Sequence, residues 1–564
     1  MRIARLGVVG LAALAAACGG DEKPAQYRVG GTVTGLSGGG LGLRLNGAES
    51  LTRQSDGPFT FEQRLDDKSA YTVTVNTQPA EQDCTVEGGT GKVAGADVTS
   101  VQVRCATKTY TVGGTVEGVR GTLVLGLEGG EQLSVTQAGR FTFTTKRPKG
   151  GAYTVSVATA PQGQRCTVTS GSGTVAGNVE GISVRCLDWF DLVSTQAATG
   201  VIGQVDFDTS TANQNQGAGP GRGTLNGPFG NPALANGRLY VTDQNSNRVL
   251  GFTGIPAADG AEAAFVLGQT SFTSTTYGAG QAALDTPAGL SSDGTLVAVA
   301  DKANSRVLLY TTPPTSTEAR PARVIGQPTF EANTAQCDQK SLNFPEGVFV
   351  GHGKLLVADT ASSRVLVWNT LPTTNEAPAD LVLGQVSFTT CAENDADGEN
   401  GTDANPSAST LWNPTGVWTD GRRLVVADNF NNRVLVWNQF PTRNGQPADV
   451  VLGQASFTTN AAATTQSGLS APTAVTSTGL QFLVADNGNN RVLVWNQYPT
   501  TPGAPADLVL GQPDFTTAYT YDPTTVGSNP SARSLQQPSG LLLAWPHLLV
   551  SDTKNNRVLV FQSR

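Results

Sequence analysis

One phrase recurs six times in the C-terminal two-thirds of this chain: an apolar strand, an aspartate, four further residues and an arginine. A second apolar run follows each arginine, a third ends in Gly-Gln, and a fourth begins near a proline. The six pairs are Asp243 and Arg248, Asp301 and Arg306, Asp359 and Arg364, Asp428 and Arg433, Asp486 and Arg491, and Asp552 and Arg557. Four short strands per repeat, six repeats and no helical periodicity predict an all-β fold, a six-bladed β-propeller.

The ends of this repeat region predict how the ring closes. The last repeat stops at Val558–Phe561 without a Gly-Gln strand, whereas an unattached one, Val201–Gln204, lies at the start. We expect the two to pair, because closure removes an exposed sheet edge.

The repeat resembles the NHL family, whose signature is a Pro-x-Gly strand followed by VADxxNNRV. The segment Asp428–Val434 matches it closely, and the resemblance covers about residues 200–564. It implies a six-bladed propeller of the NHL or TolB-like kind. Two features depart from the family: the repeats are long, from 58 residues (243 to 301) to 69 residues (359 to 428), and Ala474 replaces the glycine of Pro-x-Gly.

A second repeat precedes the first. Tyr27–Val33 returns as Tyr110–Val116, and Tyr71–Val75 returns as Tyr153–Val157. Apolar and Thr or Ser positions alternate between glycine-rich turns, which is typical of half-buried antiparallel strands. We predict two immunoglobulin-like β-sandwiches. A spacer role is favoured over a ligand-binding one, because neither unit contains a histidine or an acid–base cluster.

The N-terminus predicts export and lipidation. Two arginines precede an apolar run from Leu6 to Ala17 that is too short to span a bilayer. The following Cys18 resembles the lipidated cysteine of a bacterial lipobox, and Gly19 favours the outer membrane by resemblance to the lipoprotein sorting rule. The alternative is an ordinary signal peptide. We expect a signal peptide at 1–17, a tether at 18–26, sandwiches at 27–106 and 107–187, and a propeller at 188–564.

Six further cysteines remain, and an even count in an exported chain indicates disulfides. We predict the bridges Cys84–Cys105, Cys166–Cys186 and Cys337–Cys391, the last between matching loops of neighbouring blades.

The repeated side chains are expected to be architectural. Each aspartate is expected to accept backbone N–H bonds within its own turn, and each arginine to pair with that aspartate or with a neighbouring blade's. The alternative is a polar ligand-binding ring. The series Trp368, Trp437 and Trp495 is expected in the core between blades.

Signals of catalysis are weak. The chain has only two histidines, His352 and His547, and therefore lacks the zinc ligands of the amidating lyases that share NHL propellers. Of the residues expected to line the tunnel, only Glu346 is a carboxylate; the others are Phe229, Ala288, Thr415, Thr473 and Ser539. That set is a poor calcium cage.

One loop carries closely spaced carboxylates, namely Asp395, Asp397, Glu399 and Asp403. Such oxygen-rich, glycine-containing loops suit Ca²⁺, although the spacing is not that of an EF-hand. The alternative is a solvated acidic loop tip.

Function is expected on one face. The loops after the Gly-Gln strands are long and should project from the face that carries the Asp–Arg turns, where binding sites usually lie. With 37 basic and 45 acidic residues the net charge is −8, which argues against nucleic acid. We expect a monomeric cell-envelope lipoprotein that binds protein or glycan without catalysis. A metal-dependent, lactonase-like hydrolase or lyase at the tunnel mouth is the alternative.

Overall fold

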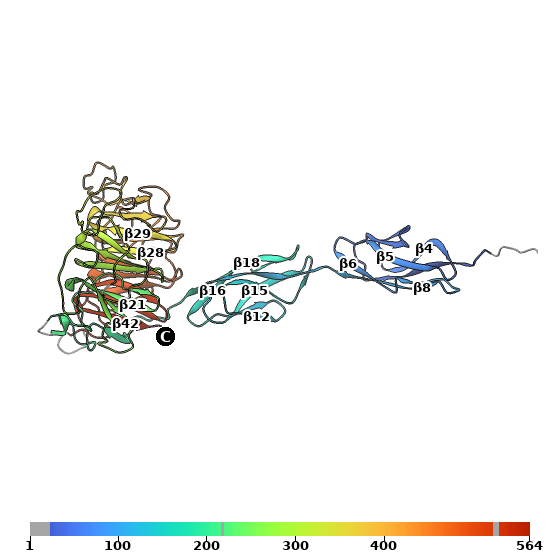
Figure 1. Ribbon diagram of the computed structural model, residues 1–564, viewed down its shortest axis with the longest axis horizontal. Coiled ribbons are helices and arrows are strands. Elements are labelled where there is room, and N and C mark those ends of the chain that lie inside the picture. The colour runs from blue at the N-terminus through green and yellow to red at the C-terminus, as the bar shows by residue number, and fades with distance from the viewer. Residues whose placement is uncertain (1–22, 216–218, 318, 523–528) are drawn as a thin grey trace, which may run out of the picture. The chain divides into compact units, whose positions relative to one another are not determined.

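A computed structural model describes residues 23–215, 219–317, 319–522 and 529–564 (Figure 1). Cys18 and the expected signal peptide lie outside the described residues. The helices of the described ranges are 3₁₀ turns of three or four residues, and none has the length or apolar character needed to cross a membrane. The chain divides into two compact units, one reaching to Ala160 and including Cys166–Cys186, the other comprising Pro161–Arg165 and Leu187–Arg564.

The first unit contains two β-sandwiches, each built from two four-stranded sheets. The sheets of the first sandwich have the orders β4(Gly57–Asp66)-β1(Gln26–Thr34)-β8(Val98–Thr107)-β6(Gln82–Glu87) and β3(Glu49–Arg53)-β2(Leu41–Leu45)-β5(Ala70–Thr77)-β7(Thr90–Lys92). Those of the second are β13(Gly139–Thr142)-β10(Val112–Glu117)-β18(Val179–Asp188)-β16(Gln164–Thr169) and β12(Glu131–Val135)-β11(Leu123–Leu127)-β15(Ala152–Thr159)-β17(Ser172–Thr174), with a short pair β14(Arg147–Pro148)-β9(Thr109–Tyr110).

Alternating inward-facing apolar residues give each sandwich a core of its own, around Phe61 in the first and Phe143 in the second. The expectation of purely antiparallel strands is wrong at one place in each: β1 pairs with β8, and β10 with β18, in parallel. The alternating pattern specifies which side chains face the core, but it does not specify strand direction.

The bridges Cys84–Cys105 and Cys166–Cys186 are present, as predicted. Cys84 and Cys105 face each other directly across β6 and β8, so this bridge fastens neighbouring strands of one sheet.

The second unit contains six four-stranded antiparallel sheets, and five of them are built from consecutive strands. Sheets one to three are β20(Ala233–Ala235)-β21(Arg238–Asp243)-β22(Arg248–Phe252)-β23(Phe265–Leu267), β24(Pro287–Ser292)-β25(Val297–Asp301)-β26(Arg306–Tyr310)-β27(Arg323–Ile325) and β28(Gly347–Gly351)-β29(Lys354–Asp359)-β30(Arg364–Trp368)-β31(Leu381–Leu383). Sheets four and five are β32(Pro414–Thr419)-β33(Leu424–Asp428)-β34(Arg433–Trp437)-β35(Val450–Leu452) and β36(Pro472–Ser477)-β37(Phe482–Asp486)-β38(Arg491–Trp495)-β39(Leu508–Leu510).

The sixth sheet combines the two ends of the unit. Its order is β19(Gly200–Ile202)-β42(Arg557–Gln562)-β41(His547–Asp552)-β40(Pro538–Ala544). Val201 lies opposite Leu559, so the predicted pairing of the unattached strand is confirmed.

Apolar residues of neighbouring sheets form joint cores, and the aromatic series of the third strands lies in them. Trp368, Trp437 and Trp495 are 1–3% exposed and pack with residues of adjacent sheets. This is the position predicted for them. The six sheets and their shared cores are compatible with a propeller.

Candidate functional site

In each of the six sheets of the second unit, a three-residue 3₁₀ turn separates the two central strands. The turns are η2(Gln244–Ser246), η3(Lys302–Asn304), η4(Thr360–Ser362), η5(Asn429–Asn431), η6(Asn487–Asn489) and η7(Thr553–Asn555). The residue after each turn has a positive φ, for example 51° at Asn432, a conformation that Asn tolerates better than most residues. This explains the second asparagine of the Asn-Asn-Arg phrase.

The aspartates accept backbone N–H bonds from the incoming loop and not from their own turn, so the sequence-based expectation of backbone bonds within the turn is wrong. From the turn itself, four of them accept only the side-chain amide of an asparagine. The Asp428 carboxylate accepts the backbone N–H of Trp412 at 2.7 Å, sixteen residues earlier. The turn closes on itself, because the N–H of Asn432 donates to the carbonyl of Asn429. Equivalent bonds to the incoming loop are made by Asp243, Asp301, Asp359, Asp486 and Asp552.

Each arginine pairs with the aspartate of its own sheet. The Nε–Oδ2 distances are 2.6–2.8 Å, and all twelve side chains are fully buried. The Arg433 guanidinium also donates to the carbonyls of Ser407 and Thr410 in the preceding loop and of Phe457 in the following one. Burial raises the pKa of Asp301 and of Asp486 to about 6, although the positive charge of the paired arginine lowers it. Both carboxylates are therefore ionised at neutral pH.

The Gly-Gln pairs fasten the long loops. Gly511 has φ 86°, and a Cβ there would lie 2.5 Å from the Leu535 side chain, so only glycine fits. The buried Gln512 amide donates to the carbonyls of Asn490 and Tyr519, which ties the turn to the loop seven residues on. Gln204, Gln269, Gln327, Gln385 and Gln454 make the same two bonds.

The residue after each turn links its sheet to the next. The Asn432 carboxamide accepts the N–H of Ala471, which precedes the following sheet, at 2.7 Å. Corresponding bonds join residues 247 to 286, 305 to 344, 363 to 413, 490 to 537 and 556 to 227. Hydrogen bonds therefore run from each sheet to its neighbour and from the last sheet back to the first.

We call the six turns and the described parts of the loops 205–227, 270–286, 328–344, 386–413, 455–471 and 513–537 the loop face. Cys337 and Cys391 form the predicted disulfide, which joins two neighbouring loops of this face. Buried side chains and this bridge hold loops that are otherwise irregular, so the loop face is preorganised.

The centre of the unit is narrow at the start of the first strands and wider further along them, where a pocket of about 320 Å³ is lined by residues of all six sheets without a charged side chain or a histidine. One cavity of about 10 Å³ is lined by residues from all six sheets, among them Phe229, Gly289, Glu346, Thr415, Thr473 and Ser539. That space holds no more than about one water molecule. The Glu346 carboxylate, its only carboxylate, pairs with Lys302 at 2.5 Å. His352 and His547 lie outside this lining.

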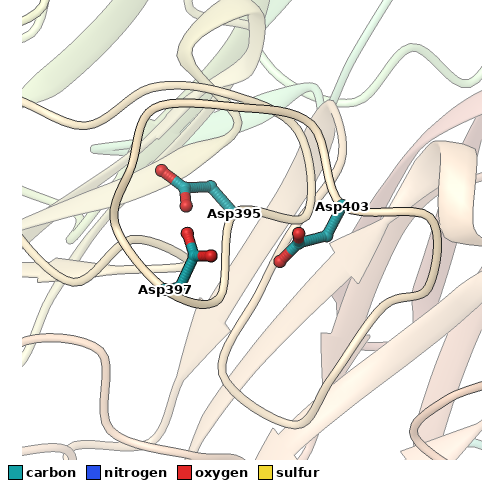
Figure 2. Close-up of side chains that lie close together, drawn as sticks. All are labelled: Asp395, Asp397 and Asp403. Carbon is teal, nitrogen blue, oxygen red and sulfur yellow. The ribbon is translucent and has the colours of Figure 1, made fainter.

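The acidic loop brings three of its four candidate ligands together. Carboxylate oxygens of Asp395, Asp397 and Asp403 lie within 4.8 Å of one another, and Glu399 is not part of the group (Figure 2). Asp395 is buried and accepts the N–H groups of Gly398 and Asn400, and Asp403 accepts that of Ala396. The loop is thus folded around its carboxylates. Oxygen ligands in this arrangement suit a hard cation such as Ca²⁺.

The loop face also carries every large, strongly exposed hydrophobic side chain of the described residues. They are Val205, Tyr277, Phe344, Val386, Phe430 and Tyr519, with exposed fractions from 41% to 72%. Trp412 packs edge-on against Phe430, with ring centroids 5.5 Å apart. The sequence analysis did not single out these residues. The available signal is that each aromatic departs from its repeat, since Ala303 and Ala361 occupy the place of Phe430.

No protein-family model and no curated protein sequence matches this chain. Among solved structures, one titled "Crystal structure of Nidogen/Laminin Complex" is similar over 47% of this chain and 75% of that chain, at 16% identity and a TM-score of 0.27. A likeness of this size carries no argument about fold or function.

Proposed function

We propose that residues 188–564 form a closed six-bladed propeller of the NHL type whose loop face is a non-catalytic binding platform for protein or glycan. The single observation that carries the proposal is the confinement of the exposed large hydrophobic side chains of the described residues to this one face. Exposed aromatic side chains on a preorganised surface are typical of binding sites, because they bury much area at little entropic cost. The centre offers little for catalysis, because it narrows to about 10 Å³ at its one carboxylate, which is paired with Lys302, and the wider pocket of about 320 Å³ is lined without a charged side chain or a histidine.

The rest of the chain fits a place in the cell envelope. Lipidation at Cys18 would anchor the protein at the outer membrane, and the two disulfide-fastened sandwiches would serve as spacers between anchor and propeller. Disulfides form in exported proteins, and the structure has three. The expected partner is an envelope protein or polysaccharide, with the chain acting as a monomer and without nucleic acid.

The test replaces three exposed aromatics by residues that other repeats carry at the same place: Phe344→Asn, Phe430→Ala and Tyr519→Thr. The full chain is incubated with outer-membrane and peptidoglycan fractions of the source cell, and co-sedimentation is measured. We expect the triple variant to lose most of its retention at an unchanged melting temperature. Arg422→Ala, in the hairpin between β32 and β33, is the control and should be retained like the wild type.

A parallel assay offers lactones, esters and glycans as substrates. Turnover that disappears in Glu346→Gln would overturn the non-catalytic proposal in favour of a hydrolase or lyase at the centre. Equal retention of the triple variant and the wild type would show that the loop face is not the platform.

A second candidate activity is calcium binding in the acidic loop. The grouping of Asp395, Asp397 and Asp403 favours it. A cation there would screen three neighbouring negative charges and brace the loop next to the Cys337–Cys391 bridge.

A further inference from the structure

A large open pocket lies between the first and second sheets, where the loop face meets the connection between β26 and β27. Its volume is about 810 Å³, and its wall comprises the loop after Gln269 together with Thr317 and Arg320 of that connection. Ligand pockets of proteins usually have volumes of about 300–1,000 Å³. The pocket is therefore large enough for several sugar rings.

The pocket has an unusual lining. Tyr277 is its only aromatic residue and is 72% exposed, and Arg320 is its only charged one. Hydroxyl groups make up much of the remainder, from Thr270, Ser274, Thr276 and Thr317, and no aliphatic side chain larger than alanine contributes.

Tyr277 stands on a fixed piece of backbone although its ring is exposed. The Gln269 carboxamide donates to the carbonyl of Thr276 and accepts its N–H, at 2.8 and 3.0 Å. On the other side, Asn304 donates to the carbonyl of Gly278 at 2.9 Å. Because this backbone is already ordered, a ligand that covers the ring has only the side chain of Tyr277 to order.

A smaller pocket of about 310 Å³ occurs at the same place of the fifth sheet. It is lined by Gly511 and Gln512, by Tyr521 and Arg533, and by Thr195 of the adjoining segment. Tyr521 lies 5.8 Å from Tyr519, centroid to centroid, and Gln512 holds the backbone of Tyr519. The loops after sheets two to four carry no tyrosine at these places: Ala335, Glu393 and Ala462 correspond to Tyr277, and Thr334, Ala392 and Ala461 correspond to Tyr519. Tyrosine, arginine and an open pocket thus occur together twice.

We propose that these two pockets, with Tyr277 and Arg320 in the larger one, bind polysaccharide. The inference rests on the proposed binding function and narrows its ligand to a glycan. The apolar C–H face of a pyranose stacks on a tyrosine ring, and its hydroxyl groups pair with guanidinium and hydroxyl groups. A protein hot spot would instead bury large apolar side chains in an apolar pocket, which this lining does not offer.

The test is affinity electrophoresis of the full chain in native gels that contain dextran, xylan, galactomannan or polygalacturonate. We expect at least one of these polysaccharides to retard the wild type. Tyr277→Ala, which copies Ala335 and Ala462 of other repeats, should weaken that binding about tenfold, the loss of one aromatic contact. Tyr277→Phe keeps the ring and should stay within about twofold. Arg320→Ala should weaken binding, whereas the matched control Arg422→Ala should not.

Absence of retardation in all four gels would overturn the glycan inference, and so would equal retardation of Tyr277→Ala and the wild type. Co-sedimentation with the envelope fractions distinguishes a failure of the glycan inference from a failure of the proposed binding platform. Loop-face-dependent retention without retardation by any polysaccharide would leave the platform standing and assign its ligand to protein.

Discussion

At the scale of residues, the six Asp–Arg pairs are the most deeply buried charges of the second unit. Each guanidinium has a carboxylate and three loop carbonyls as partners, so the cost of removing it from water is offset only while all of them are present. Each Asp–Arg pair fastens two loops to one sheet. Every one of the six sheets needs this fastening, which explains why the sequence repeats the pair six times.

Removing one arginine should therefore be costly. Arg433→Ala leaves the Asp428 carboxylate buried without its counter-ion, and we expect a loss of about 3–5 kcal/mol of unfolding free energy. Arg564→Ala removes an exposed pair, in which Arg564 and Asp191 are 57% and 55% exposed, and should cost about 0–1 kcal/mol. Denaturant unfolding of the two variants measures the difference. A comparable small loss in both would show that the buried pair is not structural.

At the scale of elements, the sequence predicts strands well and loop contacts poorly. The strand order of every sheet in the second unit, including the pairing of β19 with β42, follows from the repeated phrase, because local patterning and sequence order specify a meander. The parallel pairing of β1 with β8 and the bond from Asp428 to Trp412 depend on contacts between distant segments, which no local pattern encodes. The exposed aromatic residues could not be predicted from the repeated phrase for another reason. They stand at positions where single repeats differ from the others.

The acidic loop provides a test at the same scale. If Asp395, Asp397 and Asp403 bind Ca²⁺, a concentration 100 times the Kd stabilises the folded chain by about 2.7 kcal/mol, and the melting temperature rises by several degrees. Asp397→Ala should abolish the rise, whereas Glu399→Ala, outside the group, should preserve it. Calorimetry with added CaCl₂ or EGTA measures both. Identical melting curves with and without calcium would identify the group as a solvated loop.

At the scale of the whole molecule, the second unit combines a repeating scaffold with non-repeating loops. Six similar sheets and the hydrogen bonds that link each to the next form the scaffold, and the proposed binding depends on the non-repeating side chains of the loop face. The centre is consistent with this proposal, because it is narrow at Glu346 and its wider part, of about 320 Å³, is lined without a charged side chain or a histidine. The central proposal is therefore that ligands bind at the periphery of the loop face.

Hydrogen–deuterium exchange of the full chain, alone and with the envelope fraction that retains it, tests this claim most directly. We expect slower exchange in loop-face segments, foremost 270–286 and 512–522, and unchanged exchange in the hairpin at 420–423 on the other side of the sheets. Slower exchange confined to such hairpins or to the sandwiches, with the loop face unchanged, would contradict the account.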